Sequence, residues 1–281
     1  MKKLDRRRKY YMVLDCETAT LPCAANYDTE SRKKIAIAKP LIYDIGWTII
    51  DRKGKIYKKV NYLISEIFSV PSVFDTAYYA EKRPLYLEKV NSGELAVVGW
   101  KQAAAELNED MQQVAAVGAY NSMFDFKKAI PFTELYVNML YSPEFHEWLR
   151  FQSEVCDEIA DNRKRDGGKT FEPDVFRFRG GAFPLFDVWG LACKYLLNCD
   201  EYRAMCNELG WITASGKYYK TSAETAFRFI SQNEDFVEAH TALDDAEIES
   251  QIFGEIVGKD LKKFEIGIAY FPFRMVGKVE V

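Results

Sequence analysis

Acidic residues at three points in the chain have the types and spacing to hold metal ions. Asp15 and Glu17 are two residues apart and follow an apolar run at 10–14. On a strand, positions i and i+2 share a face, so the two carboxylates would project together. They would repel each other unless a cation lay between them, and the hard ions Mg²⁺ and Mn²⁺ prefer oxygen ligands. Alone, however, an Asp-x-Glu pair more often marks a solvated turn.

A second group of polar residues lies at 120–125, where the sequence reads Tyr-Asn-Ser-Met-Phe-Asp. The short apolar run at 114–120 predicts a strand, which would deliver Asn121 to the start of a helix that ends before Pro131. Asp125 would then lie about one turn into this helix. Taken alone, Asn121 is explained as an N-cap and Asp125 as a favourable charge near the helix N-terminus.

The third group opens a helix predicted at 242–258. His240 lies in the loop before this helix, and Asp245 lies on its first turns. Ala242 and Ala246 are small, which allows close approach of a neighbouring element. A histidine beside acidic residues at a helix start also occurs without a function, and for His240 alone the two interpretations are equally favoured.

Two other residues of suitable types are not candidates for the site itself. Asp244 points about 100° away from Asp245 on a helix, which favours a role in stabilising the helix start or in supporting the site. The chain contains 2 histidines, and the second, His146, has no clear partner in the sequence. We expect His146 to be an ordinary surface or partly buried residue.

Strands and helices predicted from hydrophobic periodicity would position the three groups. Strands are predicted at 10–14, 42–50 and 55–65, with a hairpin turn at 51–54. Helices are predicted at 95–113, 186–197, 222–231 and 242–258. Strands that lead into helices, with carboxylates at the ends of the elements, predict an α/β fold with a central mixed sheet flanked by helices.

Composition and charge argue against several classes of protein. No apolar run approaches the roughly 20 residues of a membrane helix. The apolar run after the basic residues 1–9 is too short for a signal peptide, so we expect a cytoplasmic protein without a membrane partner. None of the 6 cysteines forms a Cys-x-x-Cys pair, which argues against a structural zinc site. The net charge of −4 argues mildly against a surface that coats DNA nonspecifically.

Together, and in this order, the three groups resemble the motifs of the DnaQ-like, or DEDDh, family of 3′→5′ exonucleases. The matching patterns are Asp-x-Glu-Thr at 15–18, Asn-x-x-Phe-Asp at 121–125 and His-x-Ala-x-x-Asp-Ala at 240–246. A supporting match at 186–192, Phe-Asp-Val-Trp-Gly-Leu-Ala, is similar to the family's Asp-Thr-Leu-x-Leu-Ala segment. The resemblance covers roughly residues 8–258, apart from insertions, and implies a ribonuclease-H-like fold.

The resemblance also implies a role for each site residue. Asp15 would bridge two Mg²⁺ or Mn²⁺ ions. Glu17 and Asp245 would complete the site of the first ion, and Asp125 would hold the second largely through water. His240 would be the general base. The two ions would stabilise the attacking and leaving oxygens of the scissile phosphate, and a nucleoside 5′-monophosphate would leave the 3′ end of DNA or RNA.

Three segments are longer than a minimal exonuclease of this family requires. They cover residues 24–40, 66–94 and about 132–184, and we expect helical or loop insertions in the last two. Residues 1–258 would form the exonuclease domain, and residues 259–281 a tail packed on it or extending it. The insertions leave the choice of substrate open, but they do not affect the motifs.

A nucleic-acid 3′ terminus needs stacking surfaces and phosphate contacts, and the sequence offers candidates for both. These candidates are Tyr78, Tyr79, Arg177 and Arg179 in the insertions, and Thr18, Asn121 and Phe124 in the motifs. For any single aromatic residue, packing of an insertion onto the core is the more common role. No residue in the sequence distinguishes DNA from RNA by reading a 2′-hydroxyl.

The leading hypothesis is a freestanding, metal-dependent 3′→5′ exonuclease that acts on single-stranded DNA or RNA. A second hypothesis is a proofreading or trimming subunit that acts only within a larger nucleic-acid complex, with the insertions as docking surfaces. A third is a binding module that holds 3′ ends without cleaving them. A fourth is a phosphodiesterase of short oligonucleotides on a similar fold. A protein partner or a homodimer is compatible with each of these hypotheses.

Overall fold

The computed structural model describes residues 9–20, 39–140, 142, 144, 171–258 and 264–279. The strands are β1 (Tyr11–Thr20), β2 (Pro40–Ile50), β3 (Ile56–Ile64), β4 (Ala96–Val98), β5 (Ala116–Ala119), β6 (Phe171–Glu172), β7 (Val175–Phe178), β8 (Gly181–Asp187) and β9 (Ile268–Ala269). Within this part of the chain, seven strands form a mixed sheet in the order β4-β3-β2-β1-β5-β8-β7. A separate two-stranded sheet pairs β6 with β9.

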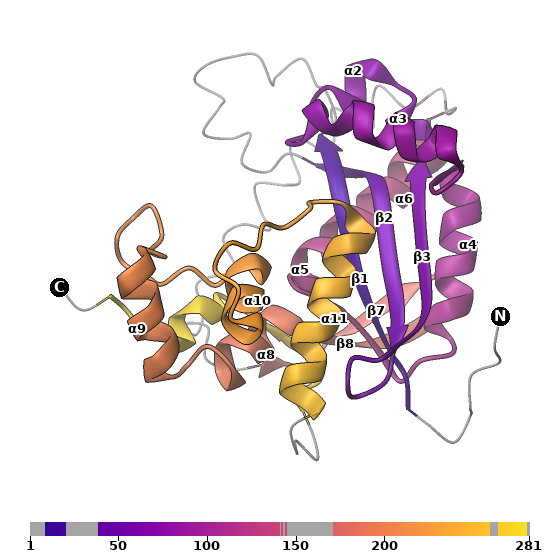
Figure 1. Cartoon of the computed structure of the whole chain (residues 1–281). Coiled ribbons are helices and arrows are strands. Elements are labelled where there is room, and N and C mark those ends of the chain that lie inside the picture. The colour runs from indigo at the N-terminus through magenta and orange to yellow at the C-terminus, as the bar shows by residue number, and fades with distance from the viewer. Residues whose placement is uncertain are drawn as a thin grey trace.

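Helices connect the strands and cover both faces of the sheet (Figure 1). They are α1 (Ser65–Phe68), α2 (Pro71–Phe74), α3 (Arg83–Ser92), α4 (Trp100–Met111), α5 (Ser122–Phe124), α6 (Ile130–Met139), α8 (Val188–Tyr195), α9 (Asp200–Leu209), α10 (Ala223–Ser231) and α11 (Ala242–Gly258). Short 3₁₀ helices lie at η4 (Ala80–Lys82) and η7 (Pro272–Met275), and a π-helical turn lies at η5 (Asp125–Ala129). The α/β class predicted from the sequence is therefore confirmed.

The strand directions agree with a ribonuclease-H-like arrangement. β1 is antiparallel to β2, and β2 is antiparallel to β3, so these three strands form a meander. β5 is parallel to β1 on the other side, and β8 is parallel to β5. The carboxyl ends of β1, β5 and β8 therefore point toward the same edge of the sheet, and β1 ends beside α2 in Figure 1.

Strand β1 separates the two hydrophobic cores and determines which side chains face each of them. Tyr11 and Val13 pack in the cluster that includes α8 and α11. Met12 and Leu14 pack on the opposite face, in the cluster that includes α4 and α6. Because side chains alternate along a strand, Asp15 and Glu17 continue the series of Tyr11 and Val13 and lie on the side of α11.

The structure corrects several element boundaries. β1 does not stop at residue 14 but continues to Thr20, because β2 pairs with it along that whole length. The helical segment after Asn121 does not end before Pro131. Instead, η5 is followed directly by α6, and Pro131 stands in the first turn of α6, just after the π-helical turn.

Two further predictions differ from the structure in detail. Residues 186–187 end β8 rather than beginning a helix, and α8 starts at Val188. The helix predicted at 95–113 starts only at Trp100, because residues 96–98 form β4. The segment 66–94 is largely helical, which agrees with the predicted helical or loop insertion, and it contains α2, η4 and α3. The prediction of a helix over 242–258 matches α11 at both ends.

Several other predictions fall wholly or partly outside the described residues. These are most of the long first connection at 24–40, the middle of the segment 132–184, and the prediction made for His146 within it. In the tail, residues 264–279 are described: β9 pairs with β6, and Lys278 forms a bridge with Tyr218. None of the helices in the described part of the chain combines the length and the apolar character needed to cross a membrane.

Candidate metal centre and active site

Strand β1 carries the first two acidic residues of the site. Asp15 pairs with Gly46 of β2, and Glu17 pairs with Asp44. Both side chains are half-buried, and a shift in the β1–β2 register follows directly after Glu17. Such irregularities re-aim the side chains beside them. Thr18 lies just beyond this shift and is also half-buried.

Asp125 comes from the segment that follows β5. Ser122 fixes the turn, since its Oγ donates to the carbonyl of Phe186 at 2.6 Å and accepts from the N–H of Ala119 at 2.8 Å. The backbone carbonyl of Asn121 accepts hydrogen bonds from Phe124 and Asp125, at 2.7 and 3.3 Å. The side chain of Asn121 makes no capping bond, although the residue holds the N-cap position. Asp125 therefore enters the π-helical turn as a buried carboxylate.

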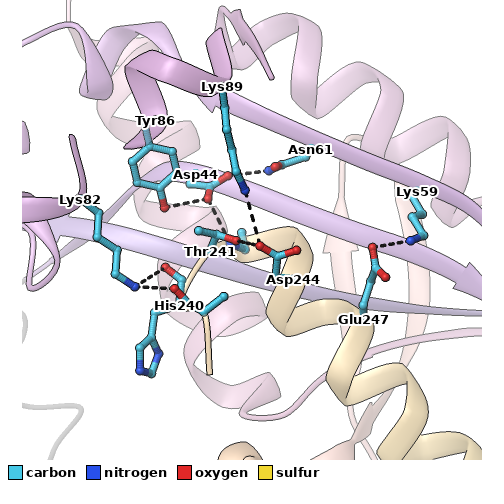
Figure 2. A network of polar contacts seen from close by, with 12 residues as sticks. Asp44, Lys59, Asn61, Lys82, Tyr86, Lys89, His240, Thr241, Asp244 and Glu247 are labelled. Atoms are coloured by element: carbon cyan, nitrogen blue, oxygen red, sulfur yellow. Dashed lines mark hydrogen bonds and ion pairs between the residues drawn. The ribbon is translucent and has the colours of Figure 1, made fainter. Parts of the chain in front are cut away.

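Helix α11 presents its first turn to the end of β1 because a strand residue caps it. The N–H of Ala242 donates to Asp44 Oδ2 at 3.0 Å. Asp44 is fully buried and also accepts from Asn61 Nδ2 at 2.6 Å and from the hydroxyl of Tyr86 at 3.0 Å. Figure 2 shows these bonds converging on Asp44. The start of α11 is therefore fixed relative to β2 and α3.

Close packing of α11 on the sheet requires the absence of a side chain at one position. A Cβ added to Gly46 would lie 2.3 Å from the backbone nitrogen of Leu243 and 2.5 Å from the carbonyl carbon of Ala242. Both are backbone atoms near the start of α11, so they cannot move independently of the helix. Gly46 pairs with Asp15 in the sheet, and the glycine thus allows α11 to approach beside the site.

Side chains from β1 and α11 meet at this edge of the sheet. One ligand atom each of Glu17, His240 and Asp245 lies within 4.8 Å of the other two. Asp245 is buried, whereas Glu17 and His240 are half-buried. His240 belongs as well to a second group with Glu224 and Glu238, and its Nδ1 lies 3.7 Å from Glu238 Oε2. The imidazole therefore lies between two sets of carboxylates.

The carboxylates raise one another's pKa values in addition to the effect of burial. Burial and then the charge of Asp44 raise the pKa of Glu17 to about 8, despite the opposing charge of Lys82. Burial, Glu238 and Glu17 raise the pKa of Asp245 to about 8. Such values mean that the ionised forms are unfavourable together unless positive charge is added.

Asp125 and Asp15 belong to the same electrostatic cluster. Burial raises the pKa of Asp125 to about 8, although a hydrogen bond with Cys16 opposes the shift. The pKa of Asp15 is raised by burial and by the charges of neighbouring carboxylates, which include Asp125, Glu17 and Asp245. All four predicted carboxylates therefore interact in this structure, although they come from three separate segments of the chain.

The donor atoms of this cluster fit a site for hard divalent cations. Among the described residues, Asp125 Oδ1 and Asp245 Oδ1 are buried and have no hydrogen-bond partner. Buried polar atoms are nearly always satisfied, so two unsatisfied carboxylate oxygens in one cluster need an additional partner. Carboxylate oxygens are the ligands that Mg²⁺ and Mn²⁺ prefer.

A fifth carboxylate, which sequence reasoning missed, lies in the same cluster. Glu249 is buried, and its Oε2 accepts the N–H of Tyr120 at 3.0 Å. Its charge is the largest contribution, after burial, to the raised pKa of Asp15. Glu249 follows Asp245 by four residues on α11, and residues at this spacing share a helix face. That spacing is the sequence signal that could have identified it.

Asp244 points away from the cluster, as its position in the helix predicts. Its Oδ2 accepts a hydrogen bond from Thr241 Oγ1 at 2.5 Å and lies 3.6 Å from Lys89 Nζ. Figure 2 shows this contact on the α3 side of the helix start. Asp244 therefore stabilises the first turn of α11 and links it to α3.

The predicted substrate contacts are distributed unevenly around the cluster. The ring of Tyr79 stacks on the ring of His240, with 4.4 Å between centroids and 16° between planes. Tyr78 is 86% exposed and packs edge-to-face on Tyr79 at 4.8 Å, so an unused aromatic face lies next to the site. Phe124 is half-buried and packs against the core beside Asp125.

The two arginines of the second insertion lie on and just after β7, at the edge of the sheet. Arg177 is exposed. Arg179 forms an ion pair with Glu134 of α6 at 3.1 Å and donates to the carbonyl of Lys101. These contacts connect β7 to α4 and α6, and no described contact joins either arginine to the carboxylate cluster. Their contact with substrate stays a prediction.

Comparisons with known proteins identify no family for this chain. No model of a protein family matches it, and no curated protein sequence matches it. Among solved structures, it aligns with the crystal structure of cell-death related nuclease 4, at a TM-score of 0.36 and 11% identity. The alignment covers 89% of this chain and 64% of that chain, which is just under two thirds of the nuclease. The interpretation of the site therefore depends on this chain's own residues.

Proposed function

We propose that this chain is a metal-dependent 3′→5′ exonuclease of the DnaQ-like, or DEDDh, type. It would release nucleoside 5′-monophosphates from the 3′ end of single-stranded DNA or RNA. One observation carries the proposal: the three sequence groups contribute four carboxylates to a single cluster, and two of them have buried, unsatisfied oxygens. A cluster of this kind is unfavourable in a protein without a cation to neutralise it.

Two Mg²⁺ or Mn²⁺ ions are the proposed cofactors. Asp15 would contribute to both ion sites, Glu17 and Asp245 would complete one, and Asp125 would complete the other. When bound, the ions would act as Lewis acids that stabilise negative charge on the phosphate during its displacement. The carboxylates would hold the ions and exclude bulk water at the edge of the sheet.

His240 would act as the general base. Burial and the nearby charge of Lys82 lower the pKa of His240 below its usual value, which favours the neutral imidazole that can accept a proton. In the proposed reaction, a water oxygen attacks phosphorus and His240 accepts the proton of that water. The bond between phosphorus and the 3′ oxygen of the preceding nucleotide breaks, its electron pair stays on that oxygen, and the oxygen takes up a proton from solvent to become the new 3′-hydroxyl. The terminal nucleotide then leaves as a 5′-monophosphate.

The 3′-terminal nucleotide would be held by residues around this cluster. The exposed ring of Tyr78 offers a face on which a base can stack, and such stacking contributes about 1–3 kcal/mol per base. Thr18 and Asn121 offer polar groups near Glu17 and Asp125 for the sugar and phosphate. We retain Phe124, Tyr79, Arg177 and Arg179 as predicted contacts, the two arginines for a strand that reaches β7.

The direct test uses single-stranded DNA and RNA of equal sequence, labelled at the 5′ end and incubated with Mg²⁺ or Mn²⁺. Wild-type protein is expected to shorten the strands from the 3′ end and to release 5′-monophosphates, and EDTA should abolish this. Asp15→Asn should reduce kcat by at least about 100-fold, because even residues that only support metal ligands contribute 10–100-fold. His240→Gln should reduce it by roughly 10²–10⁴-fold, the usual contribution of a general base.

Glu247→Gln is the matched control. Glu247 lies on α11 close to Asp245, but it is ion-paired with Lys59 at 2.6 Å, so its loss should leave the rate almost unchanged. If the isolated protein leaves long strands intact but hydrolyses dinucleotides, it is a phosphodiesterase of short oligonucleotides. Activity that appears only with a host protein, co-purified by pull-down, would identify an accessory subunit. Inactivity in all these conditions would refute the proposal.

A further inference from the structure

The segment between β3 and β4 reaches across the end of the sheet and contacts the loop that carries His240. Lys82 of η4 donates hydrogen bonds through Nζ to the carbonyls of Ala239 and His240, the latter at 3.2 Å. Figure 2 shows both bonds. Tyr79, three residues earlier in the chain, stacks on the imidazole itself. The same segment therefore contacts both the backbone and the ring of His240.

The backbone of His240 needs an external partner to keep its conformation. Its φ is +49°, in the left-handed region that is uncommon for residues other than glycine. A backbone of this kind persists only where the surroundings hold it. Lys82 supplies such a contact at the His240 carbonyl, and its Nζ also lies 4.4 Å from the centroid of the Tyr79 ring.

The segment that supplies these two residues is itself fixed to the core. Thr76 Oγ1 accepts the N–H of Thr20 at 2.8 Å and donates to the Thr20 carbonyl at 2.7 Å, which ties the segment to the end of β1. Farther along, Tyr86 is fully buried and bonded to Asp44. Tyr79 and Lys82 lie between these two anchors. Because this segment is anchored at both ends, Tyr79 and Lys82 can hold His240 in position.

Glu238 lies beside another edge of the His240 imidazole. It is half-buried, its N–H donates to Glu224 Oε2 at 3.3 Å, and Glu224 is ion-paired with Arg228 of α10 at 2.7 Å. The backbone of Glu238 is thus tied to α10, and its Oε2 lies 3.7 Å from His240 Nδ1. The ring of His240 is held in its plane by Tyr79 and faces Glu238 at one edge.

We propose that Tyr79 and Lys82 are positioning residues that hold the His240 imidazole at the carboxylate cluster, so that the segment between β3 and β4 completes the active site. This inference rests on the proposed function for its effect on rate, but not for its structural content. A catalytic group displaced by a small distance loses much of its effect. The segment between β3 and β4 would therefore position the general base, in addition to any contact that it makes with substrate.

Kinetics provide the first half of the test. Tyr79→Leu removes the flat ring, and Lys82→Met removes the donor while keeping most of the stem. Each is expected to lower kcat roughly 10–100-fold with a smaller change in KM, as expected for residues that orient a catalytic group. Tyr79→Phe and Lys82→Arg should retain most of kcat. Leu87→Ala, at an exposed position on α3, and Lys101→Met on α4 are matched controls.

Nuclear magnetic resonance provides a readout that does not need activity. The chain has 2 histidines, so ¹³C-histidine labelling gives two imidazole signals, and His146→Gln assigns the one from His240. At about pH 9, where imidazole is neutral, stacking on Tyr79 should shift the His240 signal upfield through the ring current. The signal should move downfield in Tyr79→Leu but not in Tyr79→Phe or Leu87→Ala. Lys82→Met should broaden or shift it.

The two readouts separate failure of this inference from failure of the proposed function. If wild-type protein cleaves no strand, the proposed function fails, and the resonance still reports whether Tyr79 stacks on His240. If kcat and the resonance are both unchanged in Tyr79→Leu, the positioning role is refuted. A fall in kcat with an unmoved resonance would also overturn it, since Tyr79 would then act on the substrate.

Discussion

At the scale of single residues, the protonation of His240 depends on the charges around it. Burial lowers its pKa first, and the positive charge of Lys82 lowers it further, while Glu224 opposes them more weakly. Glu238 also faces the ring. We predict that Lys82→Met raises the pKa of His240, because the imidazolium ion is then no longer repelled by a neighbouring cation. At pH 7 a larger fraction of the base would be protonated.

A titration of the His240 resonance measures this effect directly. It is carried out in EDTA, so that no bound metal ion contributes to the field at the ring. Lys101→Met, which removes an exposed lysine from α4, should leave the midpoint where it is in wild-type protein. An unchanged or lower midpoint in Lys82→Met would show that the lysine does not set the pKa of this histidine.

At the scale of elements, the contact between β2 and the start of α11 decides whether the two halves of the site meet. We predict that Gly46→Ala destabilises the protein by about 1–3 kcal/mol, the usual cost of overpacking a core. The added Cβ would lie 2.3 Å from the Leu243 nitrogen, so α11 must move away from the sheet. Activity per folded molecule should fall as well, because Asp245 moves with the helix and Asp15 does not.

Gly99→Ala is the control for this substitution. Its Cβ would meet only the Glu66 carboxylate, at 3.4 Å, which is a flexible side chain. Denaturant unfolding gives the change in stability, and assays under conditions where both variants are folded give the change in activity. Full activity of a folded Gly46→Ala protein would mean that the position of α11 on β2 does not control the site.

The same elements show which parts of the fold can be predicted from the sequence alone. The predicted α/β class and the bounds of α11 are correct because apolar periodicity reports local burial directly. The extent of β1 beyond residue 14 depends on pairing with β2, which a single strand's pattern does not contain. The helix continues past Pro131 directly after a π-helical turn, which the local sequence pattern does not predict.

For the site, as for the fold, local sequence patterns predict some features, and contacts between distant segments determine the rest. The motif spacings placed Asp15, Asp125 and Asp245 as candidates, and the structure brings them into one electrostatic cluster. Glu249 was accessible to the sequence only through its spacing from Asp245. The stacking of Tyr79 on His240 was not accessible at all, because it joins residues 161 positions apart through a segment whose path no local pattern gives.

At the scale of the whole molecule, the carboxylate cluster links stability to pH. In the folded, metal-free protein the pKa values of Glu17, Asp125 and Asp245 are raised to about 8. In the unfolded chain they return to about 4. Between these values the folded state binds more protons than the unfolded state, so stability falls as the pH rises from about 4 to about 8. Glu238 and Asp187, with pKa values raised to about 7, contribute in the same direction.

Divalent cations should oppose this loss, because they take the place of the protons. We predict that Mg²⁺ raises the unfolding temperature more at about pH 8 than at about pH 6, since ligands must be deprotonated to bind metal. Thermal unfolding in EDTA and in excess Mg²⁺ across this range measures the effect. Asp245→Asn should reduce the rise in unfolding temperature that Mg²⁺ causes. Glu247→Gln, which lies outside the cluster, should not reduce it. Equal Mg²⁺ effects at both pH values would mean that the cluster does not exchange protons for metal, and its raised pKa values would then need another explanation.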